Sequence, residues 1–217
     1  MPVGFVTIGQ SPRSDVLDPF RPPLAGVEII EAGALDALTR DEIAGLAPGG
    51  AGSVLVTRLR DGSHVVLDKD RLMPHLEGAI TGLFDRGLRV VVLLCTADFP
   101  ALMPPGLLIP AQAVMRRTVD AVLARGRLGV LIPLAEQAQE SCARFIAPGR
   151  DVRVFTASPY DSDSPARVAA AADELRAWRP DLVVLDCLGY SEAARSILAR
   201  TVTCPTIRPA SLIAHYV

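Results

Sequence analysis

Short runs of aliphatic residues alternate along the chain with segments of helical periodicity. The aliphatic runs have almost no polar alternation, which is typical of strands buried on both faces of a parallel sheet. These runs span residues 3–9, 27–34, 88–94, 107–110, 128–133, 152–157, 182–185 and 202–207. The segments with helical spacing span residues 39–47, 70–86, 111–124, 136–145, 166–178, 191–200 and 209–217. The pattern predicts an α/β fold with mainly parallel sheets.

Residues 53–67 interrupt this alternation with two β-rich arms around Asp61-Gly62. Asp-Gly between such arms is a strong signal for a β-hairpin. The hairpin is either a decoration at a sheet edge or a flap that brings Thr57, Arg58 and Arg60 to a cleft. For Arg60 the sequence favours a solvated side chain.

Two of the predicted strands end on a cysteine followed by turn residues. Cys95 closes the run at 88–94, and Cys187 follows the run at 182–185. Ligands bind at the carboxyl ends of strands in open α/β sheets, because loops diverge and helix N-termini converge there. The runs starting at Val3 and Leu128 also share a glycine in second place. We therefore expect two similar halves that face one cleft: an N-terminal lobe of residues 1–112, completed by 207–217, and a second lobe of residues 113–206.

Composition excludes several classes of function. The net charge of −2 gives no basic footprint for nucleic acid or an anionic membrane. Half of the 217 residues are hydrophobic, yet no apolar run is long enough to cross a bilayer. The four cysteines form no C-x-x-C pair, so neither a disulfide framework nor a zinc cage is indicated. The N-terminus shows no export signal, and we expect a cytoplasmic protein without metal or cofactor.

Four segments together are most similar to the AroM family, within the aspartate/glutamate racemase superfamily, and the resemblance covers essentially the whole chain. They are the loop at residues 7–13, the hairpin segment 56–62, Leu94-Cys95-Thr96 and the segment 185–190. The resemblance implies two pseudosymmetric, Rossmann-like α/β lobes, with a cysteine from each lobe meeting across the cleft between them.

Two facing thiols suit proton transfer at a carbon next to a carboxylate. One thiolate removes the proton from one face, and the opposite thiol returns a proton to the other face. The resemblance therefore implies a racemase or isomerase, or a lyase, that acts on a small carboxylate through Cys95 and Cys187. The groups expected to bind the carboxylate are those of Gln10, Ser11, Arg13, Thr57, Arg58 and Thr96, with backbone N–H groups at Leu188 and Gly189. The sequence is also compatible with a homodimer.

A different class of function is also consistent with the sequence. Amino-acid racemases of the superfamily have Asn-Thr after the first cysteine and Thr-His after the second, whereas this chain has Thr96-Ala97 and Leu188-Gly189. The alternative is a non-catalytic protein that binds a small carboxylate, or a regulatory protein, that keeps the cleft. Nucleotide binding is disfavoured, because no G-x-G-x-x-G follows a predicted strand.

Overall fold

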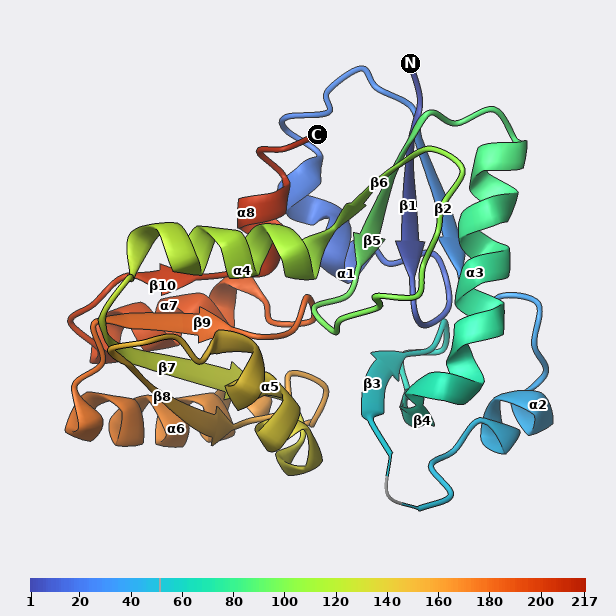
Figure 1. The fold of residues 1–217 in the computed structure, drawn as a ribbon. Helices are drawn as coiled ribbons and strands as arrows, with labels where there is room; N and C mark the ends of the chain where they lie inside the picture. The colour runs from blue at the N-terminus through green and yellow to red at the C-terminus, as the bar shows by residue number, and fades with distance from the viewer. Residues whose placement is uncertain (51) are drawn as a thin grey trace.

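The computed structural model describes residues 1–50 and 52–217, which form two four-stranded parallel sheets (Figure 1). We call them sheet A, which forms the core of the first lobe, and sheet C, which forms the core of the second. In spatial order, sheet A contains β2 (Ile29–Gly33), β1 (Val3–Thr7), β5 (Val90–Leu94) and β6 (Leu107–Pro110). In spatial order, sheet C contains β8 (Arg150–Thr156), β7 (Gly126–Ile132), β9 (Leu182–Leu185) and β10 (Thr206–Ile207).

The two sheets have the same topology. In each, the first strand lies inside the sheet, the second strand pairs on one side of it and the third on the other. The strand order thus reverses beside β1 and beside β7, and ligands bind at such switch points in open α/β sheets. The arrowheads of β1, β5, β7 and β9 all point toward the region between the two lobes (Figure 1).

Helices cover both faces of each sheet. In the first lobe they are α1 (Ser14–Leu17), the 3₁₀ turn η1 (Asp18–Phe20), α2 (Arg40–Gly45) and α3 (Lys69–Asp85). In the second they are the 3₁₀ turn η2 (Ala135–Gln137), α5 (Ala138–Phe145), α6 (Ser164–Trp178) and α7 (Glu192–Thr201). Fully buried aliphatic side chains such as Val91, Leu72, Val184 and Leu175 fill the cores between sheets and helices.

Two further helices join the lobes. Helix α4 (Ala111–Val122) connects β6 to β7 and lies between the sheets (Figure 1). The last helix, α8 (Pro209–Ile213), packs against α4 and η1, and its Ile213 belongs to the same buried cluster as Phe5 of β1. The C-terminal segment therefore packs on the first lobe, while the lobe limits at 112/113 and 206/207 stay a prediction.

The predicted hairpin is confirmed. Strands β3 (Val54–Arg58) and β4 (His64–Asp68) pair in antiparallel fashion as a separate two-stranded sheet. Gly62 in its turn has a φ of +88°, a value that favours glycine. The hairpin lies below the carboxyl end of sheet A, on the side that faces sheet C (Figure 1). It is thus placed to close the space between the lobes.

The strand predicted at 202–207 was too long, because pairing begins only at Thr206. Pro205 has no N–H to donate, so it cannot extend a ladder of hydrogen bonds. The helix predicted at 136–145 begins as the 3₁₀ turn η2, and the helix predicted at 209–217 ends at Ile213.

Candidate active site

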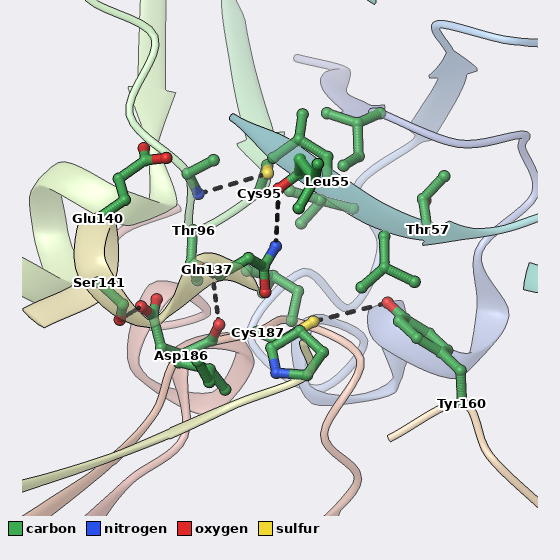
Figure 2. A pocket seen from close by; sticks show the side chains of 18 of the residues that line it. Leu55, Thr57, Cys95, Thr96, Gln137, Glu140, Ser141, Tyr160, Asp186 and Cys187 are labelled. Atoms are coloured by element: carbon green, nitrogen blue, oxygen red, sulfur yellow. Dashed lines mark hydrogen bonds between the residues drawn. The ribbon is translucent and has the colours of Figure 1, made fainter. Parts of the chain in front are cut away.

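The two strand-end cysteines line one pocket between the lobes (Figure 2). Cys95 directly follows β5 of sheet A, and Cys187 comes two residues after the end of β9 in sheet C. Equivalent strands of the two lobes therefore each deliver a thiol to the same space. The pocket holds about 590 Å³ of empty space including its mouth.

Sheet A, sheet C and the hairpin all contribute to the pocket wall. The hairpin supplies an apolar side through Val54, Leu55 and Val56, and Ile132-Pro133 lines it from the end of β7. The polar and charged residues of the wall are Arg13, Thr57, Thr96, Gln137, Glu140, Ser141, Arg144, Tyr160 and Asp186. Apolar walls with a few polar groups are typical of small-molecule sites.

The surroundings of the two thiols repeat between the lobes. Each sulfur accepts a hydrogen bond from the backbone N–H two residues later. Ala97 donates to Cys95 and Gly189 donates to Cys187, each with an N···S distance of 3.4 Å. Burial raises the pKa of Cys95 to about 12, with the Ala97 N–H acting in the opposite direction. Burial also raises the pKa of Cys187, against which the Gly189 N–H, Tyr160 and Arg13 lower it. Both raised pKa values favour the protonated thiols at neutral pH.

A charged cluster at one end of the pocket joins residues of α5 to Asp186, which follows β9 (Figure 2). Asp186 Oδ2 accepts hydrogen bonds from Ser141 Oγ at 2.5 Å and from Arg144 Nη1 at 2.8 Å. Burial raises the pKa of Asp186, although the Arg144 charge and the Ser141 hydroxyl lower it. Its other carboxylate oxygen is buried without a hydrogen-bond partner among the described residues. Glu140 continues the cluster and pairs with Lys69 of α3 at 3.4 Å.

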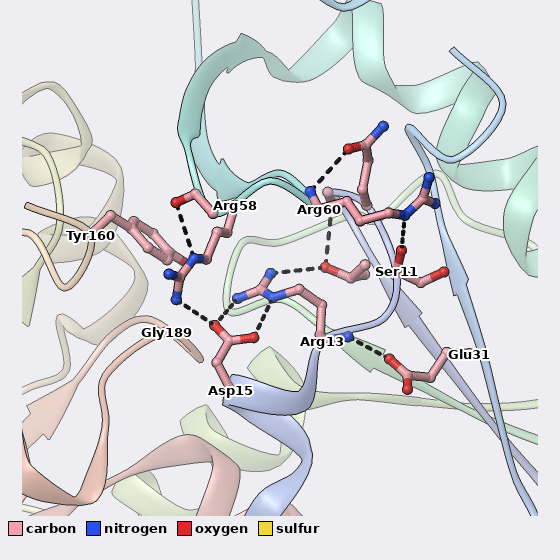
Figure 3. A network of polar contacts seen from close by, with 12 residues as sticks. Ser11, Arg13, Asp15, Glu31, Arg58, Arg60, Tyr160 and Gly189 are labelled. Carbon is pink, nitrogen blue, oxygen red and sulfur yellow. Dashed lines mark hydrogen bonds and ion pairs between the residues drawn. The ribbon is translucent and has the colours of Figure 1, made fainter. Parts of the chain in front are cut away.

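Arg13 is a buried cation of the pocket wall, and Figure 3 shows its polar contacts. Asp15 holds its guanidinium with two hydrogen bonds, at 2.8 and 3.0 Å, and Thr7 Oγ1 accepts a third at 3.3 Å. The charge of Arg13 lowers the pKa of Cys187, whereas the charge of Arg144 lowers that of Cys95. Each thiol thus has a guanidinium in its electrostatic surroundings.

A model of the AroM protein family matches residues 3–217. The chain belongs to the AroM family. No curated protein matches it in sequence. The family membership predicted from the four sequence segments is confirmed.

Solved structures confirm the predicted two-lobed fold of the aspartate/glutamate racemase type for this AroM protein. Glutamate racemase from Francisella tularensis, in complex with D-glutamate, is 14% identical and aligns with a TM-score of 0.60 over 100% of this chain and 79% of that one. Arylmalonate decarboxylase is 13% identical, with a TM-score of 0.63 over 99% and 92%. Allantoin racemase from Klebsiella pneumoniae is 15% identical, with a TM-score of 0.62 over 100% and 85%.

Six of the residues predicted for the site in this AroM protein line the pocket. They are Arg13, Thr57, Cys95, Thr96, Cys187 and Leu188. Thr57 has a buried hydroxyl without a hydrogen-bond partner among the described residues, and Thr96 donates to the backbone oxygen of Asp186 at 3.0 Å. Gly189 adjoins the pocket and donates its N–H to Cys187. The roles of these residues in binding and catalysis stay predictions.

Gln10, Ser11 and Arg58 lie outside the pocket lining. Ser11 donates its N–H and its hydroxyl to the two carboxylate oxygens of Asp36, so its polar groups are used within the first lobe. Gln10 bonds the backbone of Leu35 and Arg60. Arg58 turns toward Gly62 and Asp15. These polar groups join the hairpin and the loop after β2 to the loop after β1.

Arg60 was expected to be solvated, and its side chain is 54% exposed. It nevertheless bonds Ser11 and Asp36, as part of the same contact between hairpin and loop (Figure 3).

Sequence reasoning missed the pocket residues of α5 and Tyr160. Ser141 and Arg144 are spaced by three residues and share a helix face, but the sequence gives no sign that this face meets Asp186. The mid-helix position of Cys142 in α5 predicts a small buried residue, but this side chain is partly exposed. Tyr160 lies in a loop rich in Ser, Asp and Pro, where a lone aromatic residue has no periodicity to mark it.

The described residues contain no cluster of three or more His, Cys, Asp or Glu side chains arranged to hold a metal ion. None of the helices described is long and apolar enough to cross a membrane.

Proposed function

We propose that this protein is a racemase or isomerase that moves a proton at the carbon next to the carboxylate of a small acid, without a cofactor. The observation that carries this proposal is the meeting of two thiols, one from each lobe, on a single pocket. Glutamate racemase from Francisella tularensis, which binds D-glutamate in its crystal structure, has the same fold. Arylmalonate decarboxylase also has this fold, which supports the lyase alternative.

Cys187 acts as the base and Cys95 as the acid in this proposal. The deprotonated Cys187 takes the proton from the α-carbon, and the electron pair of the C–H bond moves into the carboxylate to give an enediolate. Cys95 then donates its thiol proton to the opposite face of that carbon, leaving Cys95 as the thiolate and Cys187 as the thiol. Two observations support this assignment of base and acid. Burial raises the pKa of Cys95 to about 12, whereas Arg13 and Tyr160 lower the pKa of Cys187.

The carboxylate of the acid is held by donors on the side of the first lobe. Arg13 supplies positive charge, and Thr57 supplies a buried hydroxyl with no partner among the described residues. Removing such a hydroxyl from water without pairing it is costly, so a ligand that accepts its hydrogen bond recovers that free energy. Oriented donors also stabilise the enediolate charge in a pocket from which water is excluded.

Incorporation of solvent deuterium tests the proposal. Small carboxylic acids with 2-amino, 2-hydroxy or unsaturated dicarboxylic structures are incubated with the protein in D₂O, and exchange at the α-carbon is followed by NMR. We expect exchange in one class of acid, abolished in Cys95→Ala and Cys187→Ala. Cys142→Ala and Cys204→Ala are matched controls and retain it, because neither residue lines the pocket. Exchange that persists in the Cys187→Ala variant contradicts the proposed base.

The raised pKa of both thiols also favours a second candidate, a protein that binds a small carboxylate without turnover. This candidate predicts thermal stabilisation by an acid that is never exchanged, and stabilisation that survives replacement of either cysteine by alanine. If no acid of the three classes exchanges its α-proton but one of them stabilises the protein in this way, the protein binds the acid without turning it over.

A further inference from the structure

Tyr160 brings a phenol hydroxyl to the sulfur of Cys187. The hydroxyl oxygen lies 3.6 Å from Sγ, and either atom can be the donor. Figure 2 shows the ring pointing from its loop toward Cys187, at the edge of the pocket. Tyr160 thus contacts the sulfur of a proposed catalytic cysteine, although the sequence gave Tyr160 no role in the site.

The position of this hydroxyl is fixed by both lobes. The ring stacks on His64 of the hairpin, with ring centroids 6.2 Å apart. On its other side the phenol lies against Gly189, where a Cβ would come within 2.5 Å of the hydroxyl oxygen. Residue 189 must therefore lack a side chain for the phenol to reach Cys187.

Arg13 acts on the same hydroxyl through its charge. Its charge lowers the pKa of Tyr160, as it lowers the pKa of Cys187. Since a guanidinium can only donate hydrogen bonds, Arg13 does not accept the phenol proton, and the O–H stays available to the sulfur. Burial and the charge of Cys187 raise the pKa of Tyr160, so the phenol keeps its proton in the presence of a thiolate.

We propose that Tyr160 is a catalytic residue, whose hydroxyl donates a hydrogen bond to the Cys187 thiolate and thereby makes Cys187, rather than Cys95, the base. This inference rests on the proposed function for its catalytic meaning, but the hydrogen bond can be tested without any substrate. A buried thiolate needs donors to offset lost hydration. Cys187 has two, the Gly189 N–H and Tyr160, whereas Cys95 has the Ala97 N–H.

In the part of the chain that the structure describes, none of the other groups near Cys187 donates a hydrogen bond to its sulfur, apart from the Gly189 N–H. The charge of Asp186, which precedes it in the chain, raises its pKa, and a Cys95 thiolate repels a Cys187 thiolate. Tyr190 is buried beside it, but its hydroxyl donates to the Ala157 carbonyl at 2.7 Å. Arg13 is the cation that favours the thiolate, and it is shared with Asp15. Loss of the Tyr160 hydroxyl therefore leaves the Gly189 N–H as the remaining direct donor.

The test is the pH dependence of Cys187 alkylation in the Tyr160→Phe variant. The full-length protein is treated with iodoacetamide over a pH series, and modification of the Cys187 peptide is quantified by mass spectrometry. We expect the midpoint to move upward by about one pH unit, which corresponds to roughly tenfold slower alkylation at any pH below both midpoints. A change of access alone scales the rate equally at every pH and leaves the midpoint in place.

Tyr190→Phe is the matched control, because it removes a phenol hydroxyl from the same neighbourhood that does not bond the sulfur. Its midpoint stays at the wild-type value. An unchanged midpoint in Tyr160→Phe, or equal shifts in both variants, overturns the inference. If no acid undergoes deuterium exchange, the proposed reaction fails while the midpoint still reports on the hydrogen bond, so the two failures are distinguishable. Where exchange occurs, Tyr160→Phe lowers kcat more than it changes KM.

Discussion

Burial and reactivity oppose each other at the two thiols. A sulfur shielded from water reacts only when donors or cations compensate the lost hydration of the thiolate. Cys95 is buried and has a single direct donor, whereas Cys187 is partly exposed and has two. The two cysteines are equivalent by topology but different in electrostatics, which is the asymmetry a base and an acid require.

This difference predicts the order of chemical modification. In the native protein without ligand, Cys95 is alkylated by iodoacetamide last of the four cysteines. Its pKa is raised to about 12 and its side chain is buried, while Cys142, Cys187 and Cys204 are all partly exposed. Peptide mapping after a time course measures the order. Urea-unfolded protein is the control, in which all four react at similar rates. Early labelling of Cys95 in the native state contradicts the assignment of Cys187 as base.

The Arg144–Asp186 pair predicts a pH-dependent loss of stability. Arg144→Met removes the cation that lowers the pKa of Asp186, so the pKa already raised by burial rises further. A carboxyl whose pKa is higher in the folded than in the unfolded state costs stability that grows as pH rises. We expect a loss of roughly 3–5 kcal/mol at pH 8 and a smaller loss at pH 5.

Urea unfolding at the two pH values measures this loss. Arg167→Met is the control, because Arg167 and its partner Asp163 are both more than half exposed. It changes stability little at either pH. Equal losses at both pH values for Arg144→Met would show that packing, and not the charge of Asp186, dominates at this site.

The sequence marks residues of the site only where a regular element constrains them. Cys95 and Cys187 are predictable because aliphatic runs fix where the strands end, and strand ends in an α/β sheet face a cleft. Ser11 and Arg13 stand in the same loop, yet Arg13 is buried at the pocket while Ser11 bonds Asp36. Loop residues follow no period, so their directions depend on tertiary partners such as Asp15 and Asp36 that the sequence does not pair with them.

At the scale of elements, the hairpin decides the shape of the pocket. Asp61-Gly62 predicts its turn, but its place over the pocket depends on contacts between distant segments. Gln137 of η2 donates to the Val54 carbonyl at 3.0 Å, and Arg60 bonds the Ser11 carbonyl at 2.8 Å. One prediction made the hairpin a flap that brings Thr57, Arg58 and Arg60 to a cleft. Thr57 does line the pocket, whereas Arg58 and Arg60 bind neighbouring loops.

The close approach of this hairpin to Gly9 predicts a steric effect. In Gly9→Ala the new Cβ would lie 2.5 Å from the Arg58 carbonyl oxygen and would also collide with the Thr57 hydroxyl. The Arg58 carbonyl belongs to the backbone and cannot rotate away as a side chain can, so the hairpin must shift. We expect this shift to lower the free energy of unfolding by roughly 1–3 kcal/mol. Gly78→Ala in α3 is the control, since no atom lies within 4 Å of its Cβ. It should stabilise by roughly 0.5–1 kcal/mol. Urea denaturation of both variants, with opposite signs of effect, is the measurement.

At the scale of the molecule, several contacts bridge the two lobes around the pocket. Lys69 of α3 pairs with Glu140 of α5, Thr96 bonds the Asp186 carbonyl, and His64 stacks on Tyr160. Each is a single polar or aromatic contact, and the ion pair is partly exposed, so each contributes little on its own. A ligand that touches the wall from both sides adds to these contacts and couples the lobes.

Ligand binding should therefore protect both lobes from hydrogen exchange together. The acid that stabilises the protein most in a thermal screen is added at roughly 100 times its Kd, which stabilises the native state by about 2.7 kcal/mol. Amide exchange should then slow at the end of β5, in residues 186–188 after β9 and in β3, because all three segments line the pocket. The outer strand β2, none of whose residues lines this pocket, serves as the internal reference. Protection confined to one lobe would mean that the acid contacts only one of the two thiols. Proton transfer between the two faces of one carbon would then have no structural basis.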